Sequence, residues 1–256
     1  MKIVSWNVNS IRARYDRVLN WLQYNEPDVL CLQELKCVDA EFPYDEISSL
    51  GYTAAVYGQK TYNGVAIISY DEPENVVTSF NDGVDDPQAR VIAATIDGVR
   101  VVNVYVPNGG EIGSDKWRYK LAWYERLRTY FDTHYDPNTP LALCGDFNVA
   151  PLDKDVARPK QWGDGVLCVP EIRASLQRVV DWGLVDTFRM HNDEEGQYSW
   201  WDYRKGGFQY GNGLRIDMVY ATQVLADMCT GCVIDRSERE GEKPSDHAPV
   251  VAEFDC

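Results

Sequence analysis

The sequence is poor in positive charge and has no long hydrophobic run. Its 256 residues carry 25 Lys and Arg against 40 Asp and Glu, which gives a formal net charge of −15. No apolar stretch approaches the roughly 20 residues that cross a bilayer, so we expect no membrane partner. Repeats, low-complexity tracts and Pro/Gly/Ser-rich linkers are also missing, which excludes fibrous and disordered classes. The shortage of Lys and Arg argues against a phosphate-rich partner, because such partners usually require a basic surface.

The seven cysteines lack the paired spacing of a zinc site. Cys229 and Cys232 form one CxxC, but no second pair completes four ligands, so chance spacing on a strand is the better interpretation. Cys31 and Cys144 lie in apolar runs and are interpreted as buried free thiols. The segment from Met1 has no charged stretch followed by an apolar one, so we expect no secretory signal. These features predict a reduced, cytoplasmic location.

Hydrophobic patterning predicts a mixed α/β fold. Helical spacing predicts helices over 15–24, 114–131 and 170–182, with Ser114 as an N-cap. Asp97-Gly98 predicts a type I′ hairpin turn, which needs positive φ at both positions. The pattern favours one domain over residues 1–256, with two packed sheets covered by helices. The predicted strands are 3–6, 29–32, 65–69, 91–96, 99–104, 141–144, 198–201, 214–220 and 249–254.

Polar side chains follow several of these strands at the point where each strand ends. Functional groups concentrate on loops that a rigid scaffold positions, so strand ends that gather would place these residues around one cleft. They offer carboxylate and amide oxygens and one imidazole, and hard oxygen ligands suit Mg²⁺ or Mn²⁺. We therefore predict metal-assisted phosphoryl transfer to water, with Glu34 as the main ligand helped by Asn7 or Asp246. The full set is Asn7, Glu34, Asp146, Asn148, Asp217, Asp246 and His247.

Each of these residues also has a purely structural interpretation. An Asp or Asn after a strand usually forms a turn, and a single His is more often structural than catalytic. Asp217 is harder to explain in this way, because it interrupts an apolar run and a buried carboxylate is costly without a partner. His247 is a natural partner, since an Asp that holds a His in one tautomer is a recurring catalytic device. The functional interpretation therefore rests on these residues together.

Nine segments resemble, in order along the chain, the exonuclease III family of apurinic/apyrimidinic endonucleases. This family belongs to the wider endonuclease/exonuclease/phosphatase fold. Leu214 stands where many members carry Trp, and the bacterial exonuclease III branch is more similar to the chain at this position. The segments are SWNVNSIR (5–12), CLQELK (31–36), YNGVA (62–66), NVYVPNG (103–109), GDFNVAP (145–151), GLVDTFR (183–189), YSWWDYR (198–204), GLRID (213–217) and SDHAP (245–249).

The resemblance implies a four-layer α/β sandwich, in which two packed mixed sheets are flanked by helices and the active site lies at one edge of the sheets. It also implies a Mg²⁺ ion, which Mn²⁺ can replace. Glu34 would be its main ligand, with Asn7 and Asp246 close by. Asp146 and Asn148 belong to the same expected metal environment.

The resemblance further implies a role for each catalytic residue. Asp146 would position or activate the attacking water, and Asn148 would hold the phosphate or Asp146. Tyr105 would reach the phosphate or the leaving oxygen. His247, backed by Asp217, would bind a non-bridging phosphate oxygen as negative charge develops.

The implied partner is double-stranded DNA with abasic sites or blocked 3′ ends. Trp200, Leu214 and Ile216 would line an apolar pocket for a flipped-out abasic sugar, because a missing base lowers the cost of unstacking. The implied enzyme is a monomeric DNA-repair nuclease that cleaves 5′ to an abasic site. It would also act as a 3′→5′ exonuclease and clean blocked 3′ ends. Further DNA contacts are expected from Arg12, Lys36, Asn63, Arg90 and Asn108.

Two other functions are compatible with parts of the sequence. A phosphatase of the same wide fold would act on inositol phosphates or lipids, but the 198–203 segment and the Asn108-Gly109 loop argue against it. A binding module that kept the fold and lost the site would lack some of the candidate ligands. Asn7, Glu34 and Asp246 are all present, which argues against such a module.

The net charge of −15 is compatible with a DNA substrate if the charges are segregated. We expect a basic rim that faces DNA on an otherwise acidic body. Such a surface predicts modest, strongly salt-sensitive affinity. The expected rim residues are Arg12, Lys36, Lys60, Arg90, Arg189, Arg204, Lys205 and Arg215.

Overall fold

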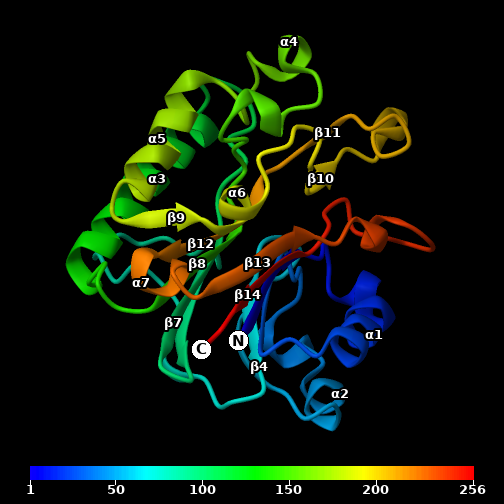
Figure 1. The fold of residues 1–256 in the computed structure, drawn as a ribbon, viewed down its shortest axis with the longest axis vertical. Coiled ribbons are helices and arrows are strands. Elements are labelled where there is room, and N and C mark those ends of the chain that lie inside the picture. Colours follow the sequence, from blue (N-terminus) through cyan, green and yellow to red (C-terminus); the bar gives the residue numbers. More distant parts are fainter.

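Two six-stranded sheets lie face to face at the centre of the molecule (Figure 1). The computed structural model describes residues 1–256 except the side chain of Lys205, so that predicted rim residue lies outside the described side chains. The first sheet has the order β13-β14-β1-β2-β4-β3 and the second β5-β6-β7-β8-β12-β9. Parallel pairing joins β1 to β2 and β7 to β8, and the other neighbouring strands of the two sheets are antiparallel.

The strands are short, and a small separate ribbon accompanies the two sheets. The first sheet contains β1 (Lys2–Asn7), β2 (Val29–Gln33), β3 (Thr53–Tyr57), β4 (Val65–Ser69), β13 (Cys229–Ile234) and β14 (Val250–Phe254). The second contains β5 (Glu74–Val77), β6 (Val91–Ile96), β7 (Val99–Tyr105), β8 (Leu141–Asp146), β9 (Leu184–Asp186) and β12 (Asp217–Thr222). The ribbon pairs β10 (Trp200–Trp201) with β11 (Gly213–Leu214).

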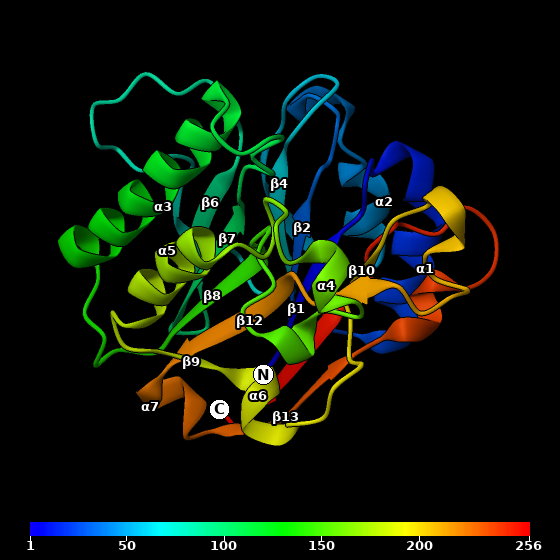
Figure 2. The same ribbon diagram turned by 90° about the horizontal axis from the view of Figure 1, so that it is seen from above.

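Helices cover the outer faces of both sheets, which produces four layers (Figure 2). One apolar core lies between the sheets, a second lies under α3 and α5, and a third lies under α1 and α2. The predicted four-layer α/β sandwich is therefore confirmed. The helices are α1 (Tyr15–Asn25), α2 (Tyr44–Ser49), α3 (Asp115–His134), α4 (Pro159–Trp162), α5 (Pro170–Val180), α6 (Thr187–His191) and α7 (Gln223–Ala226). Single 3₁₀ turns occur at 12–14, 39–41, 153–155, 204–206 and 236–239.

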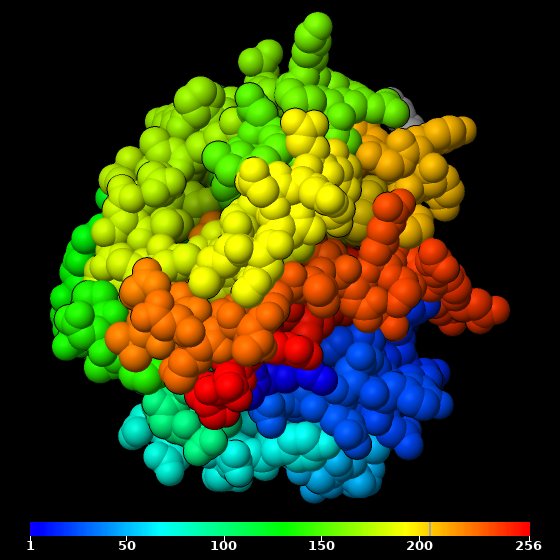
Figure 3. Space-filling model, viewed as in Figure 1, coloured from blue at the N-terminus to red at the C-terminus, as the bar shows by residue number. Residues whose placement is uncertain are grey.

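The two ends of the chain lie side by side. Strand β14 runs antiparallel to β1, and Lys2 is opposite Glu253. In the space-filling view the C-terminal residues, in red, lie against the N-terminal residues, in dark blue (Figure 3). This pairing brings the segment before β14 to the end of β1, which is where the first polar residues of the expected site lie.

The local signals in the sequence agree with the structure where they are strong. Asp97 and Gly98 have φ values of 46° and 77° at the turn between β6 and β7, and Ser114 accepts a hydrogen bond from the Trp117 amide at the start of α3. The expected strand over 214–220 is wrong in one detail. It is interrupted between β11 and β12, because the amide of Arg215 donates to the carbonyl of Asp155 and not to a neighbouring strand.

The cysteines lie on strands and in loops of both halves of the molecule. All seven are free, and Cys31 and Cys144 are buried between the sheets. Cys229 and Cys232 lie on strand β13, as the interpretation of their spacing required. Across the described residues, the helices are all too short or too polar to cross a bilayer.

A buried ion network holds the segment that precedes β12. Asp155 is fully buried and lies 2.7 Å from Arg215 and 2.5 Å from Arg189. Arg215, 1% exposed, also lies 2.8 Å from Asp186. The expectation that Arg189 and Arg215 belong to a DNA-facing rim is therefore wrong, because both guanidinium groups are used inside the protein.

Removing the central charge of this network should destabilise the fold. We expect Asp155→Asn to lower the free energy of unfolding by about 3 kcal/mol, because it leaves two guanidinium groups short of a buried partner. Urea denaturation would measure the change. Asp153→Asn is the matched control: Asp153 pairs with Arg173 but is 79% exposed, so its loss should cost at most about 1 kcal/mol. Equal effects of the two substitutions would contradict this account.

The unfolding free energies of wild type and Asp155→Asn should become more similar in acid. Burial raises the pKa of Asp155, but Arg215 and Arg189 outweigh burial, and the pKa lies below its usual value. A lowered folded-state pKa contributes stability above the unfolded pKa of about 4, and this stability is lost as the pH falls further. The gap in unfolding free energy between wild type and Asp155→Asn should therefore narrow below about pH 4. A gap that widens in acid would refute the assignment.

Candidate active site

The ends of four central strands bring the predicted residues to one edge of the two sheets. Strand β1 ends at Asn7, β7 at Tyr105 and β8 at Asp146, while Glu34 follows the end of β2. Because β1 and β2 are parallel, as are β7 and β8, each pair ends at the same edge. Strand β12 runs in the opposite direction and begins at Asp217, directly opposite Asp146. Residues far apart in the sequence thus meet at one place.

The backbone at this edge adopts conformations that ordinary side chains rarely allow. Glu34 has φ 54° and Asn148 has φ 50°, both in the left-handed region. Such residues cluster at functional sites, where the surrounding structure holds them in place. Gly145, directly before Asp146, has φ 151°, and a Cβ atom there would lie 1.9 Å from the Val104 carbonyl oxygen. Only glycine lets β8 approach β7 this closely.

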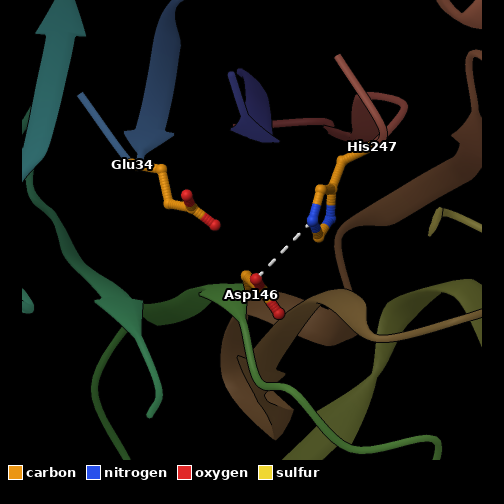
Figure 4. A group of neighbouring side chains, drawn as sticks. All are labelled: Glu34, Asp146 and His247. Carbon is orange, nitrogen blue, oxygen red and sulfur yellow. Dashed lines mark ion pairs between the residues drawn. The ribbon is translucent and has the colours of Figure 1, made fainter. Parts of the chain in front are cut away.

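Three side chains from separate segments converge on one point (Figure 4). Glu34, Asp146 and His247 each offer one ligand atom, and these atoms all lie within 4.8 Å of one another. The Asn7 amide lies between the two carboxylates, donating to Glu34 Oε1 at 2.9 Å and to Asp146 Oδ2 at 3.0 Å. Two carboxylates with amide oxygens nearby form the hard donor set that a divalent cation prefers, so the residues present fit a metal ion.

Glu34 is kept ionised by its neighbours. Burial raises its pKa, but the ammonium group of Lys36 and the hydrogen bond from Asn7 outweigh burial and lower it. Lys36 Nζ lies 2.9 Å from Glu34 Oε2, and it also contacts Asn9 Oδ1. This carboxylate therefore carries a full negative charge at neutral pH, as a metal ligand must.

Asp146 has the opposite tendency. Burial raises its pKa to about 7, and the charges of Asp217 and Glu34 act in the same direction, although His247 opposes them. Asn148 donates to Asp146 twice, from its backbone amide to Oδ1 at 2.9 Å and from its side chain to Oδ2 at 3.3 Å. A carboxylate with a pKa near neutrality, fixed in orientation, is suited to general base catalysis.

His247 is held as a cation by a buried aspartate. Its Nδ1 lies 2.9 Å and 3.0 Å from the two oxygens of Asp217, and its Nε2 lies 3.8 Å from Asp146 Oδ2. Burial by itself lowers the pKa of His247, but Asp217 and Asp146 outweigh it and raise the pKa to about 10. Ser199 donates to Asp217 Oδ2 at 2.6 Å. The imidazolium therefore presents a fixed Nε2–H donor beside Asp146.

Ser199 and Asn9 also organise this site, although sequence reasoning assigned them no role. Ser199 accepts hydrogen bonds from the amides of Ile216 and Asp217 and thereby orients the aspartate. Asn9 donates to Asp246 Oδ1 at 2.8 Å. Both residues lie in segments that resemble the family, at 198–204 and 5–12. Neither Ser nor Asn is a typical acid, base or metal ligand, so their roles are evident only from their contacts.

Tyr105 and Asp246 complete the wall around the three converging groups. Burial raises the pKa of Tyr105, and the carboxylates of Glu34 and Asp146 raise it further, so the phenol stays protonated. Asp246 is satisfied on both oxygens, by Asn9 and by Trp200 Nε1 at 3.0 Å. Among the described residues, Asp246 is not part of the group whose ligand atoms lie within 4.8 Å, so it stands beside that group.

A cleft of about 660 Å³ opens beside this centre. Trp200 and Ile216 line it as expected, and Trp162 lies against Trp200 with ring centroids 5.8 Å apart. Leu214 does not line it: the side chain is 0% exposed and packs behind the wall with Leu167 and Ile216. The strand pairing of β10 with β11 buries it there. Acidic residues Glu111, Asp164 and Asp202 also line the cleft.

The side chains predicted to contact DNA differ in their exposure and in the partners that they already have within the protein. Asn108 is exposed at the cleft, and Arg90 packs over the Tyr105 ring at 4.7 Å and donates to the Tyr105 carbonyl. Arg12 is 60% exposed but paired with Glu41 at 3.1 Å. Asn63 is 6% exposed and donates to Gln59, so its side chain is engaged within the protein.

The expected rim residues are thus divided. Lys36, Arg90 and Arg204 lie at or beside the cleft, and Arg204 is paired there with Asp202. The basic rim expected from the sequence is incomplete, because Arg189 and Arg215 are paired inside the protein.

A buried carboxylate with a raised pKa, an imidazolium donor and a second carboxylate that fits a metal ion meet the requirements for adding water to a phosphorus centre. The site is therefore that of a hydrolase acting on phosphoesters. Residues 4–247 match the endonuclease/exonuclease/phosphatase family, and the chain belongs to that family. The recognition of this family from the sequence is confirmed.

Individual relatives narrow the class to nucleases. The chain is similar to exodeoxyribonuclease III of Haemophilus influenzae, with 37% identity over 266 aligned residues that cover 99% of this chain and 100% of the relative. Among solved structures it resembles an AP endonuclease from Archaeoglobus fulgidus (41% identity, TM-score 0.97). It also resembles the 3′ phosphatase NExo from Neisseria bound to a product DNA hairpin (42% identity, TM-score 0.96). Both comparisons cover 100% of each chain. The chain is a nuclease of the DNA-repair type that hydrolyses phosphodiester bonds.

The metal site can be tested without any substrate. We expect Mg²⁺ or Mn²⁺ to raise the melting temperature, since an ion at 100 times its Kd stabilises the fold by about 2.7 kcal/mol. Glu34→Gln should abolish most of this rise, because it removes the ionised ligand. Glu111→Gln removes an acidic group of the cleft that is outside the converging set, and it should keep the rise. The same metal-dependent shift in both variants would rule out Glu34 as the main ligand.

Proposed function

We propose that this chain is a Mg²⁺-dependent nuclease that cleaves duplex DNA 5′ to an abasic site and leaves a 3′-hydroxyl. One observation carries the proposal: Glu34, Asp146 and His247 meet within 4.8 Å at the edge of a cleft that is partly apolar. Mn²⁺ can replace Mg²⁺ in this proposal. The similarity to an AP endonuclease and to a 3′ phosphatase supports DNA with abasic sites or blocked 3′ ends as the substrate class.

Glu34 is the main metal ligand in this mechanism. Asn7 orients it together with Asp146, and Asp246 and Asn148 lie beside them as further candidate ligands. When bound, the ion would polarise the phosphate and stabilise charge on an oxygen. The protein itself holds the two carboxylates at fixed positions before substrate arrives, so little reorganisation is needed.

The proton steps are divided between Asp146 and His247. Asp146 orients the attacking water and accepts its proton, and the raised pKa of its carboxyl makes that transfer favourable near neutral pH. His247 donates from Nε2 to a non-bridging phosphate oxygen as negative charge develops, while Asp217 keeps the imidazole charged and fixed. Tyr105 keeps its proton and donates to the phosphate or to the leaving oxygen.

The cleft beside this centre accepts a sugar that has left the duplex stack. Trp200, Trp162 and Ile216 provide apolar contacts, and Leu214 supports them from behind. An abasic nucleotide costs less to extrude than a paired one, which favours such substrates. Arg12, Lys36, Arg90 and Asn108 are the proposed contacts to the flanking DNA.

The same centre accounts for two further activities in this proposal, 3′→5′ exonuclease cleavage and removal of 3′ phosphate groups. Both transfer a phosphoryl group at a 3′ end to water and need no additional catalytic group. We also propose that residues 1–256 act as one domain and as a monomer. The seven free cysteines support a reducing, cytoplasmic location.

A product assay on matched duplexes tests the substrate assignment. We expect Mg²⁺-dependent nicking of a duplex that contains one tetrahydrofuran abasic analogue, faster than degradation of the undamaged duplex, and release of phosphate from a 3′-phosphate end. EDTA should abolish all three activities. Cleavage that persists in EDTA would exclude the metal mechanism. Phosphate release from an inositol polyphosphate with no DNA cleavage would instead favour a phosphatase.

Substitution of the base should separate chemistry from binding. We expect Asp146→Asn to lower kcat on the abasic duplex by roughly 100-fold or more, because general base catalysis contributes about that much. DNA affinity should be retained, since no positive group is lost. Asp136→Asn, an exposed change far from the cleft, is the control. A wild-type kcat in Asp146→Asn would refute the role given to Asp146.

A further inference from the structure

One buried lysine contacts three segments that border the cleft. Lys120 lies on α3, and its side chain is 0% exposed. Its Nζ donates to the backbone oxygens of Asn108 at 3.0 Å, Asn148 at 2.7 Å and Val166 at 2.8 Å. An ammonium group has three N–H donors and no acceptor, so three carbonyls satisfy it completely. The three carbonyls belong to three segments that are distant from one another in the sequence.

Stability alone does not explain a lysine at this position. Among the described residues, no carboxylate forms an ion pair with Lys120. Besides the three carbonyls, its Nζ faces the Trp117 ring at 5.8 Å, and burial lowers the pKa of Lys120 to about 7, although the charge of Asp146 acts against burial. Burying a charge is costly unless it is fully hydrogen-bonded, and an apolar residue of similar volume often stabilises a core as well or better. What lysine provides here, and an apolar residue cannot, is directional contact with three loops at once.

Two of these contacts lead to the proposed base. Asn108 donates from its side chain to Asn148 Oδ1 at 3.0 Å, and Asn148 donates to both oxygens of Asp146. Lys120 holds the backbone of Asn108 and of Asn148. A shift of either loop would therefore rotate the carboxylate of Asp146 relative to Glu34 and His247.

The third contact leads to the substrate side of the cleft. Val166 lines the cleft together with Gly165 and Leu167, on the segment that follows α4. Because this segment contains no strand, the bond from Lys120 is one of the few that fix it relative to the catalytic loops. The position of Val166 determines how much room a sugar has beside Trp200.

The stem of Lys120 is also enclosed by the loop that it holds. Gly109 has φ 96°, and a Cβ atom there would lie 2.9 Å from Lys120 Cδ and 3.2 Å from the Trp117 ring. The loop therefore rests directly on the aliphatic part of the side chain. The packing and the hydrogen bond together constrain both the position and the orientation of this loop. A hydrogen bond to the ammonium group alone would not do so.

We propose that Lys120 is a positioning residue that couples the two halves of the site: it orients Asp146 through Asn148 and sets the width of the substrate cleft through Val166. The inference rests on the function proposed above for Asp146 and the cleft. Lys120 bonds backbone carbonyls and touches no reacting atom. Its role is to keep the base and the substrate wall in one fixed relation.

The test compares Lys120→Met with Lys116→Met. Both substitutions remove one lysine from α3, but Lys116 is exposed and bonds none of the three loops. Amide hydrogen exchange is measured first, because it needs no activity. In Lys120→Met we expect the amides of 106–110, 147–150 and 163–168 to exchange at least about tenfold faster, with the sheets unchanged. Lys116→Met should match wild type. Unchanged protection of all three loops in Lys120→Met overturns the proposal.

Kinetics then separate positioning from a general loss of folded protein. With a folded fraction verified by calorimetry, we expect Lys120→Met to lower kcat on the abasic duplex by roughly 100-fold, as a misplacement of about 1 Å can do, and to raise KM. Phosphate release from a 3′ end needs a correctly oriented Asp146 but no sugar in the cleft. For this reaction Lys120→Met should lower kcat with little change in KM. Lys120→Arg, which keeps the charge and donors, should recover part of kcat. Wild-type kcat and KM in Lys120→Met would refute the proposal.

The two proposals can fail separately. If wild type cleaves no DNA with any divalent ion, the proposed function is wrong, and the exchange rates alone decide whether Lys120 holds the loops. If wild type is active and Lys120→Met keeps both its loop protection and its rates, only the role of Lys120 is wrong. If Lys120→Met does not fold, the exchange and kinetic comparisons are made with Lys120→Gln, which removes the charge and leaves two N–H donors for three carbonyls. Normal loops with normal rates in Lys120→Gln again refute the coupling.

Discussion

The Asn7 amide bonds one carboxylate from each half of the molecule, and the rest of the site depends on that contact. Glu34 follows a strand of the first sheet and Asp146 ends a strand of the second, so their separation is the separation of the sheets. One amide that donates to both, at 2.9 Å and 3.0 Å, keeps two negative charges close together. Without such a donor, or a cation, the two carboxylates would repel each other.

A second polar link lies directly beneath this contact. Gln33 donates to Asn103 Oδ1 at 2.8 Å, and Asn103 donates to the carbonyls of Leu32 and Ala66 on the opposite sheet. All these groups are buried, where a hydrogen bond is strong and a missing one is costly. Gln33 precedes Glu34, and Asn103 lies two residues before Tyr105. The two sheets are thus registered by directional bonds next to the site and by apolar packing elsewhere.

A separate basic surface for DNA does not account for the net negative charge of the chain. Arg189 and Arg215 form ion pairs with Asp155 inside the protein. The cleft itself is lined by acidic residues, namely Glu111, Asp164 and Asp202. A nucleic acid that approaches this face meets few unpaired cations. In the function proposed above, binding relies on the shape of the cleft and on a metal ion more than on a basic surface, which limits non-specific contact with undamaged DNA. Specificity is then gained at the expense of affinity.

How much the sequence revealed varied with the range of the interaction. The Asp97-Gly98 turn, the Ser114 cap and the main strands follow from local preferences and were predicted correctly. The short strands β3, β5 and β9 and the short helices were not named as elements, because three to six residues rarely show a clear period. Ser199, Asn9 and Lys120 could not be assigned, because each acts through a partner at least 12 residues away.

The sequence by itself determined the main strands and the longer helices, the carboxylates and amides at the strand ends, and the family to which the chain belongs. These depend on residue type and on spacing along the chain, which one sequence displays in full. Tertiary structure alone decided that Leu214 lies behind the cleft wall, that Arg215 is buried in an ion network, and that Lys120 joins three loops. The reason is physical. Burial and hydrogen-bond partners depend on how distant segments pack together, and a local sequence pattern does not determine that packing.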